Sequence, residues 1–302
     1  MNISKYKPHL AILGANLFYG ANYTIAKFVM PEFLEPFAFI FLRVSGALLF
    51  FIFMQLFIPR EKIESKDYLR LFFCGVFGVA LNQLMFFKGL NLTVPINASM
   101  IMITTPILVM LLSAILLKEK MPWFKLVGLA FGLVGAFFMI GGKNFNFTSN
   151  TALGDSMVLV NAISYSVYLI IVKPLMVKYK PFTVIKWVFF FGFFPVLFFS
   201  YPELQDISFS NFTIKAWWSL GFVILGVTVG AYLLNIYGLS KVDPSVVGIY
   251  IYLQPILAIF FAWMFLGEIH LTFEKVIAGL LIFSGVYLVS FGKRHFSKVA
   301  NN

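Results

Sequence analysis

Long apolar runs alternate with short polar gaps along the whole chain. A helix that spans a lipid bilayer needs about 20 mostly apolar residues, and ten runs meet this condition. They cover residues 9–29, 36–57, 67–88, 95–117, 122–141, 152–172, 183–200, 216–237, 244–266 and 272–291. The gaps between the runs are too short to hold a soluble domain. The pattern therefore predicts an all-α integral membrane protein with ten transmembrane helices.

The apolar pattern also occurs twice. Residues 89–119 align without a gap on residues 238–268. The matched positions include Pro95 with Pro244, Pro106 with Pro255, and Glu119 with Glu268. Each unit holds five of the expected helices, the first in residues 1–143 and the second in residues 144–302. Because five is odd, the second unit enters the membrane from the opposite side, so the sequence predicts two inverted five-helix repeats.

Composition supports a membrane protein. The chain is 61% hydrophobic and 12% charged, whereas soluble domains are about 45–50% apolar and about 25% charged. Apolar surface on this scale needs a lipid bilayer as its solvent. The net charge of +11 does not indicate a nucleic-acid partner, because no basic patch with interleaved aromatic residues lies outside the apolar runs.

The positive charges also predict the orientation. Lys and Arg are enriched in the cytoplasmic loops of membrane proteins. With the N-terminus inside, seventeen of the 23 cations fall in cytoplasmic segments and four fall outside. Both termini are therefore expected in the cytoplasm, in a multi-pass protein of the cell (inner) membrane. Lys5 and Lys7 precede an apolar run as in a signal peptide, but the run continues to Val29 and is long enough to span the membrane.

Inverted repeats have a physical use. Two similar halves that are flipped relative to each other can exchange conformations, which turns an inward-open state into an outward-open state of similar energy. The sequence therefore favours a carrier that works by alternating access. A duplication that only builds a membrane scaffold or sensor is the alternative from another class.

Several motifs resemble a known family. The two P-x(10)-P-I-L-x(10)-E runs, the motif LLKEKMPWFKLVGLAFGLVGAFFMI and its copy FLGEIHLTFEKVIAGLLIFSGVYLVS resemble the drug/metabolite transporter superfamily, in particular its EamA-type members. Tyr19–Gly20 and Arg43 match an aromatic–glycine pair and an arginine of that family, whereas Lys88 departs from its pattern. The resemblance covers nearly the whole chain. It implies export or exchange of small polar metabolites along a pathway lined by helices 1, 3, 4, 6, 8 and 9.

Amides and hydroxyls within the expected spans are candidates for substrate recognition. Several share a helix face through i, i+4 spacing, and such groups usually face a bundle interior or a cavity. The alternative is hydrogen bonding between helices, worth about 0.6 kcal/mol for each bond on average. The expected polar substrate-binding set is Asn16, Tyr19, Tyr23, Gln83, Thr104, Thr105, Asn161, Tyr165, Tyr168, Tyr232, Asn235, Tyr250 and Gln254.

Arg43 and Lys88 complete the expected binding set as the two cations well inside the predicted spans. A buried cation costs about 2.5–3.5 kcal/mol on the insertion scale, so Arg43 is expected to bind a substrate carboxylate or to pair with the other half. Lys88 lies near a helix end and can instead extend to the interface. Pro106 and Pro255 each remove a backbone donor within a span, which predicts either hinges or passive kinks.

Little in the sequence indicates enzymatic, metal or cofactor chemistry. His9, His270 and His295 lie at helix ends or in loops, and no cluster has metal-ligand spacing, so neither an enzyme, a metal nor a cofactor is expected. No carboxylate lies in the middle of a span, which argues weakly against coupling through a buried acid. Two G-x-x-x-G pairs, Gly128/Gly132 and Gly226/Gly230, permit close helix packing and leave a homodimer open.

These observations lead to one functional expectation. The protein is expected to move a small polar or amphipathic metabolite across the cell membrane, with amino-acid efflux first among the choices. A multidrug efflux carrier is the second choice within the transporter class, and a non-transporting scaffold or sensor remains the alternative outside it.

Overall fold

The computed structural model describes residues 6–30, 32–93, 98, 101–140, 152–266 and 273–299. Within the described helices, the side chains at positions 23, 27, 136, 139, 140, 255, 258, 259, 262, 266, 274, 275 and 292–299 are not described. Every regular element in the described part of the chain is a helix. Lys5, Pro95, Glu268 and His270, which the sequence-based predictions use, lie outside the described residues.

Each expected span contains helix. In the first half the elements are α1 (Lys7–Val29), α2 (Pro36–Met54), α3 (Ser65–Gly75), η2 (Val76–Ala80), α4 (Leu81–Leu92), α6 (Thr105–Leu116) and α7 (Trp123–Ile140). In the second half they are α8 (Ala152–Lys178), α9 (Pro181–Leu204), η4 (Phe209–Asn211), α10 (Ile214–Phe222), η5 (Val223–Gly230), α11 (Ala231–Lys241), α12 (Pro244–Ile249), η6 (Tyr250–Leu253), α13 (Gln254–Leu266) and α14 (Phe273–Val299). Five continuous helices among the described residues are long and apolar enough to cross a membrane, and shorter apolar helices add to them. The predicted ten-helix fold of two inverted repeats is confirmed.

The third span of each half contains a π-helical segment at an equivalent position. The segment η2 joins α3 to α4, and the segment η5 joins α10 to α11. A π segment adds a residue to the turn and is common at functional sites. It also changes which side chains face the bundle centre, so a plain 3.6-residue period does not predict the faces beyond it.

The fourth span of each half is broken before its second proline. Residues 103 and 104 form a turn, after which Pro106 occupies the first turn of α6. In the second half the 3-10 segment η6 precedes α13, whose second residue is Pro255. Proline fits the first turn of a helix because the N–H it lacks would have no partner there. The prolines therefore mark the start of a new helix rather than a kink within a continuous one.

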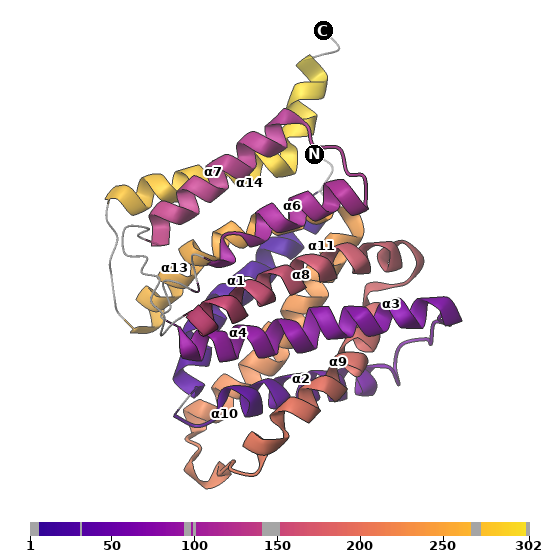
Figure 1. Ribbon diagram of the computed structural model, residues 1–302, viewed down its shortest axis with the longest axis vertical. Coiled ribbons are helices and arrows are strands. Elements are labelled where there is room, and N and C mark those ends of the chain that lie inside the picture. The colour runs from indigo at the N-terminus through magenta and orange to yellow at the C-terminus, as the bar shows by residue number, and fades with distance from the viewer. Residues whose placement is uncertain are drawn as a thin grey trace.

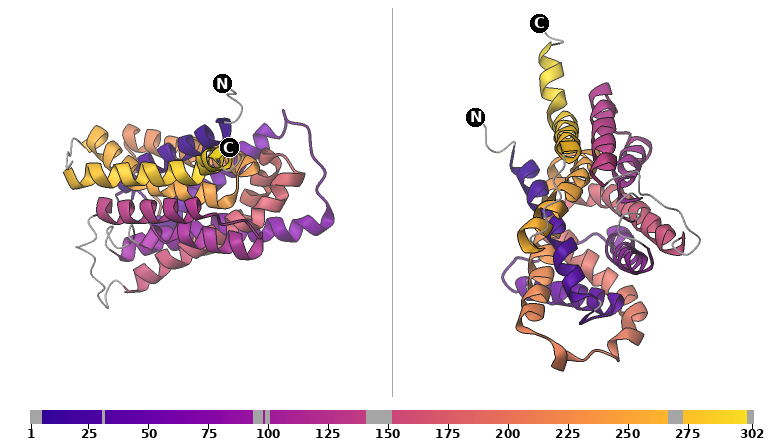
Figure 2. Two further views of the ribbon diagram at one scale, coloured as in Figure 1. Left: turned by 90° about the horizontal axis from the view of Figure 1, so that it is seen from above. Right: turned by 90° about the vertical axis from the view of Figure 1, so that its left-hand side faces the viewer.

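Helices of the two halves pair with each other across the molecule. In Figure 1, α4 lies beside α8 and α1 beside α11, and these two pairs are equivalent under the repeat. The pairs α2 with α9 and α7 with α14 bring together the second helices and the last helices of the two halves. Figure 2 shows α7 and α14 as a separate flank of the bundle. The bundle is thus assembled across the repeat boundary.

Glycines of α7 set the close approach of that flank. A Cβ atom at Gly128 would meet the backbone of Gly285 in α14, and a Cβ atom at Gly132 would overlap the ring of Tyr252 in η6. The G-x-x-x-G pair of α7 is therefore used for packing within the chain. In the other pair, Gly226 packs against Phe18 of α1.

The second and seventh helices cap one another at opposite ends. The Glu203 carboxylate at the end of α9 accepts hydrogen bonds from the N–H groups of Phe37 and Ala38 in the first turn of α2, at 2.7 and 3.0 Å. Conversely, the Glu61 carboxylate accepts from the N–H of Lys180 before α9, at 3.1 Å. An anion at a helix N-terminus satisfies unpaired N–H groups and the helix dipole. This reciprocity follows from the inverted repeat.

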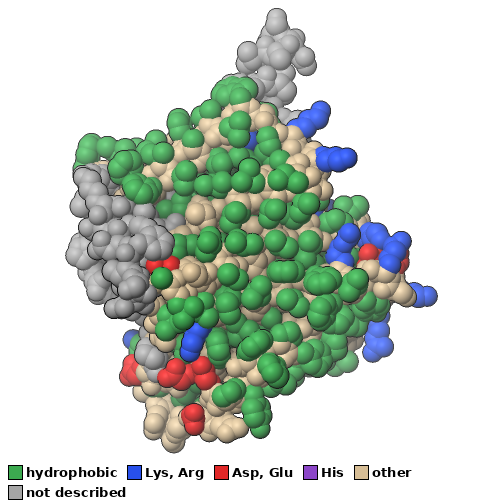
Figure 3. All heavy atoms as spheres, in the orientation of Figure 1, with side chains coloured by type: hydrophobic (Ala, Val, Ile, Leu, Met, Phe, Trp, Pro, Cys, Tyr) green, Lys and Arg blue, Asp and Glu red, His purple; other side chains and the backbone are tan. Residues whose placement is uncertain are grey.

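The surface separates charge along the helix direction. In Figure 3 apolar side chains cover the visible face, Lys and Arg gather at the right-hand edge, and acidic side chains lie mostly at the lower left. Because successive spans run in opposite directions, the α2–α3 connection lies at the same end as the start of α1. This connection carries Arg60 and Lys62, so this is the cation-rich end. The α1–α2 connection with Glu32 and Glu35 lies at the opposite end, which is the acid-bearing end of the bundle.

Packing at Gly132 gives the first prediction. The substitution Gly132→Ala should lower the unfolding free energy in detergent by about 1–3 kcal/mol, since an overfilled core costs that much. The matched control is Gly221→Ala in α10, where an added Cβ meets nothing within 4 Å. That change should be neutral or stabilise by up to about 1 kcal/mol. Denaturant titration followed by fluorescence measures both, and equal effects at the two sites would contradict the packing.

Candidate functional site

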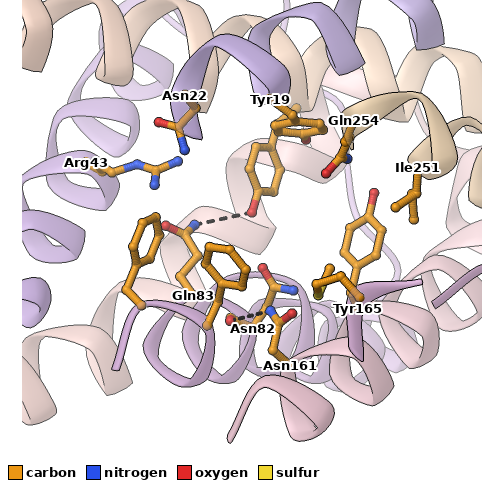
Figure 4. Close-up of a pocket in the computed structure, with 13 residues that line it drawn as sticks. Tyr19, Asn22, Arg43, Asn82, Gln83, Asn161, Tyr165, Ile251 and Gln254 are labelled. Atoms are coloured by element: carbon orange, nitrogen blue, oxygen red, sulfur yellow. Dashed lines mark hydrogen bonds between the residues drawn. The ribbon is translucent and has the colours of Figure 1, made fainter. Parts of the chain in front are cut away.

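A polar cavity lies between the two halves. Its volume is about 120 Å³. The residues that line it are Tyr19, Asn22, Arg43, Asn82, Gln83, Phe86, Phe87, Met102, Asn161, Tyr165, Tyr232, Ile251 and Gln254. They come from helices 1, 2, 3, 4, 6, 8 and 9, which adds helix 2 to the expected pathway. Figure 4 shows their side chains around the space.

The cavity lies toward the acid-bearing end of the bundle. Asn22 is seven residues from the end of α1 and Arg43 seven residues after the start of α2, which corresponds to about 10 Å of helix in each case. Asn161 is nine residues after the start of α8. These helix ends are all at the acid-bearing side, whereas Tyr232 lies nine residues before the cation-rich end of α11. The cavity therefore extends from the middle of the membrane-spanning region toward the acid-bearing side.

Arg43 is buried in this wall with 4% of its surface exposed. Its Nε donates to the hydroxyl of Thr228 in η5 at 3.1 Å. Its guanidinium carbon lies 5.5 Å from the ring centre of Phe39 and 5.2 Å from that of Phe87. No described carboxylate forms an ion pair with it, and its Nη1 has no hydrogen-bond partner. Aromatic faces and one hydroxyl therefore hold a cation that retains a free donor.

Three amides on the same cavity present oxygen atoms. Gln83 Nε2 donates to the hydroxyl of Tyr232 at 3.2 Å, and Asn161 Nδ2 donates to the carbonyl of Asn82 at 2.7 Å. These bonds fix which end of the Gln83 amide and of the Asn161 amide is the oxygen. Gln83 Oε1, Asn161 Oδ1 and Asn22 Oδ1 are buried and have no partner. A buried polar atom without a partner costs about 1–3 kcal/mol, so these oxygens suit a ligand that donates hydrogen bonds.

The π-helical segments help to position these groups. In η2 the carbonyl of Gly78 accepts from Tyr232 at 3.2 Å, and the carbonyl of Phe77 accepts from Ser164 at 2.7 Å. In η5 the carbonyl of Val223 accepts from Thr228 at 2.7 Å. Side chains thereby satisfy backbone groups that lipid cannot satisfy. The same bonds hold Tyr232 against Gln83 and Thr228 against Arg43.

Seven residues of the expected set line the cavity, namely Tyr19, Arg43, Gln83, Asn161, Tyr165, Tyr232 and Gln254. Two others lie behind them. Asn16 accepts from Gln254 at 3.1 Å, and Asn235 donates to Tyr165 at 2.7 Å. The Gln254–Asn16 bond joins the two halves directly beneath the lining, whereas the Asn235–Tyr165 bond lies within the second half.

Other expected residues lie away from the lining. Tyr250 contacts His9 at 3.0 Å toward the cation-rich end, and Lys88 Nζ lies 5.3 Å from the ring centre of Phe37. Tyr168 packs on Gly78, and Thr104 donates its hydroxyl to the carbonyl of Ile101 at 2.6 Å. Thr105 is fully buried in the first turn of α6 beside Pro106. The side chains of Tyr23 and Pro255 lie outside the described part of the chain.

Six lining residues are not among those predicted from the sequence, namely Asn22, Asn82, Phe86, Phe87, Met102 and Ile251. A signal existed for two of them. Asn22 lies one helical turn beyond Tyr19, and Asn82 precedes Gln83 in the middle of an apolar run. The apolar four carry no signal that distinguishes a cavity wall from a packed core.

A buried ionic cluster closes the cation-rich end between the halves. The ammonium of Lys125 and the hydroxyl of Ser245 both donate to the Glu119 carboxylate, and Lys125 Nζ lies 3.2 Å from Ser245 and 3.6 Å from Asp243. The side chains of Lys125 and Glu119 are 9% and 8% exposed. Glu119 and Lys125 belong to the first half, whereas Ser245 and Asp243 begin the fourth span of the second.

Local structure places Glu119 in this cluster. Helix α6 ends at Leu116 with Leu117 as its C-cap, and Lys118 after it has a left-handed φ of 52°. The N–H of Glu119 donates to the carbonyl of Ser113 at 3.1 Å. A left-handed residue just past a helix end is a common way to end a helix, and it turns the chain away from the helix axis. At the same end, Lys173 of α8 donates to the carbonyls of Leu239 and Val242, each at 2.6 Å.

Comparison with known proteins gives a family match over both halves. A model of the EamA-like transporter family matches residues 7–141 and again residues 152–291. The uncharacterized transporter YoaV of Bacillus subtilis is 27% identical over 291 residues, which cover 94% of this chain and 97% of that protein. A probable terminal-alkyne amino-acid exporter of Streptantibioticus cattleyicolor is 26% identical over 231 residues, or 75% of this chain and 74% of that protein. One crystal structure shares the fold, with a TM-score of 0.78 at 18% identity over 96% of this chain and 98% of its own.

The ionic cluster gives the second prediction. The substitution Lys125→Met should lower the unfolding free energy by about 3–5 kcal/mol, because it leaves the Glu119 carboxylate buried without a counter-charge. Adding Glu119→Gln should recover part of this loss, since the amide carries no charge. Denaturant titration of the single and double variants measures the coupling.

The matched control for this cycle is Lys66→Met, because the Lys66–Glu64 pair is 73% and 52% exposed. It should leave the transition unchanged, since exposed ion pairs add little. If Lys125→Met behaved like the control, or if its effect simply added to that of Glu119→Gln, the cluster would not hold the two halves together.

Proposed function

We propose that this chain, which belongs to the EamA-like transporter family, exports a small zwitterion of the α-amino-acid class by alternating access. The observation that carries the proposal is the set of unpartnered polar atoms on one cavity. The set combines one cationic donor, Arg43 Nη1, with three amide oxygens from Asn22, Gln83 and Asn161.

The charges of this set complement an amino acid. A carboxylate would accept from the guanidinium of Arg43, which prefers anions of planar geometry. An ammonium group carries three donors and would donate to the amide oxygens. No acidic side chain lines the cavity, so a cation without a carboxylate would meet the uncompensated charge of Arg43. The chemistry therefore favours a zwitterion over a simple amine.

The size of the cavity favours an amino acid over a drug. Pockets that hold drug-sized ligands measure about 300–1,000 Å³, whereas this cavity measures about 120 Å³. The aromatic residues Tyr19, Phe86 and Phe87 can pack against an apolar side chain. A similar protein of Streptantibioticus cattleyicolor is described as a probable terminal-alkyne amino-acid exporter, which supports the same class.

The closed cation-rich end supports alternating access. The cavity extends from the middle of the bundle toward the acid-bearing end, and the Glu119–Lys125–Ser245 cluster seals the other end. With the termini in the cytoplasm, as the charge pattern predicts, this conformation faces outward. Transport from the cytoplasm requires the cluster to open and the breaks before Pro106 and Pro255 to act as hinges. Two halves with equivalent breaks and equivalent π segments can exchange these conformations.

Transport by purified protein in proteoliposomes gives the third prediction. We expect counterflow of a radiolabelled neutral amino acid, and little competition from its decarboxylated amine. The substitution Arg43→Gln should reduce flux about 10- to 100-fold, the factor that follows from losing a charged hydrogen bond of about 1.5–3 kcal/mol. Asn161→Ala and Gln254→Ala should each reduce the flux by a comparable or larger factor.

The matched control is Arg70→Gln, which removes an exposed guanidinium from α3. It should transport normally, and monodisperse gel filtration should show that every variant is folded. Flux of drug-like cations with no response to amino acids would favour the multidrug alternative. The absence of flux across an amino-acid and metabolite panel, with folded protein, would favour a scaffold or sensor.

A further inference from the structure

A second hollow opens on the lipid-facing surface. This groove has a volume of about 680 Å³ and is lined by residues of α1, α10 and α13. Its lining is apolar apart from Thr24, Ser219 and Lys215. Leu17 and Phe265 beside the groove are 40% and 53% exposed. In a membrane protein such surface faces acyl chains, so lipid is the solvent of this groove.

Helix α1 separates the groove from the polar cavity. Tyr19 and Asn22 line the cavity, whereas Phe18 and Ala21 on the other face of α1 line the groove. The groove follows α1 from Gly14 to Phe28, which corresponds to about 21 Å of helix. One leaflet of the hydrocarbon core is about 15 Å thick. The groove therefore covers at least the depth of one leaflet, and it reaches the interface at the acid-bearing end.

The side chain of Lys215 lies at the interfacial end of the groove. Lys215 lies in the first turn of α10, and its Nζ is 4.5 Å from the ring centre of Phe28. None of the ion pairs in the described part of the chain includes Lys215. Trp218, one turn further into the groove, is 76% exposed. Tryptophan is enriched at membrane interfaces, which places this end of the groove at headgroup level.

We propose that the groove binds one acyl chain of an anionic phospholipid, whose phosphate pairs with the ammonium of Lys215. A hollow of leaflet depth with an apolar wall and a single terminal cation has the shape and charge of that molecule. The proposal depends on the membrane fold and is independent of the proposed transport substrate. It identifies a lipid site on the helix whose opposite face lines the cavity.

Native mass spectrometry of the purified protein tests the site. The protein is titrated with dioleoyl phosphatidylglycerol and, separately, with dioleoyl phosphatidylcholine. We expect one phosphatidylglycerol to bind at lower concentration than phosphatidylcholine. The substitution Lys215→Gln should weaken phosphatidylglycerol about fivefold, the factor that one lysine supplies near an anionic surface. Ser219→Trp should weaken both lipids by filling the groove.

The matched control is Lys88→Gln. Lys88 is also a lysine placed over a phenylalanine ring near the same end of the bundle, but it lines no part of the groove. It should leave lipid affinity unchanged. The proposal would be overturned if the two lipids bound with equal affinity and neither variant changed that affinity. Ordinary surrounding lipid would behave in this way. Loss in Lys215→Gln without loss in Ser219→Trp would also overturn the proposal, as would a dimer that excludes lipid.

Discussion

A guanidinium buried in the membrane-spanning part of the bundle constrains the structure around it. Even the lenient insertion scale assigns about 2.5–3.5 kcal/mol to such a charge, and no described carboxylate neutralises Arg43. The protein stabilises it with two aromatic faces, with the hydroxyl of Thr228 and with a polar cavity. Thr228 belongs to the second repeat and lies in its π-helical segment. The cation thus links the pairing of the halves, the π segment and the cavity.

The inverted repeat explains why the cavity forms where it does. Gln83 and Tyr232 occupy equivalent positions of the two halves and hydrogen bond to each other at 3.2 Å. Equivalent residues can meet only near the axis that relates the halves, so the cavity lies close to that axis. The ends of the bundle are unlike, however. The Glu119–Lys125–Ser245 cluster closes the cation-rich end, and the breaks in the fourth spans lie at equivalent positions of the two halves.

The sequence predicts the helices well because length and hydropathy decide whether a segment spans a bilayer. It predicts the lining less completely. The π segments η2 and η5 change the helix faces on which Gln83 and Tyr232 lie. No residue pattern in the sequence predicts these segments. Asn16 and Asn235 have the expected polarity, yet they hydrogen bond to Gln254 and Tyr165 behind the wall. Phe86, Phe87 and Ile251 look like any core residues, because only tertiary structure determines whether an apolar side chain meets another or a hollow.

The most direct test of the account is the accessibility of the cavity to water from one side of the membrane. In a Cys74→Ser background, the variant Asn82→Cys in oriented vesicles is exposed to a membrane-impermeant thiol reagent added from either side. Val158→Cys, at a fully buried position of α8, serves as the unreactive reference. The account predicts labelling of Asn82→Cys from the side opposite the termini, and slower labelling when the transported amino acid is present. A position that reacts from neither side, like the reference, would mean a dry centre and would contradict the account.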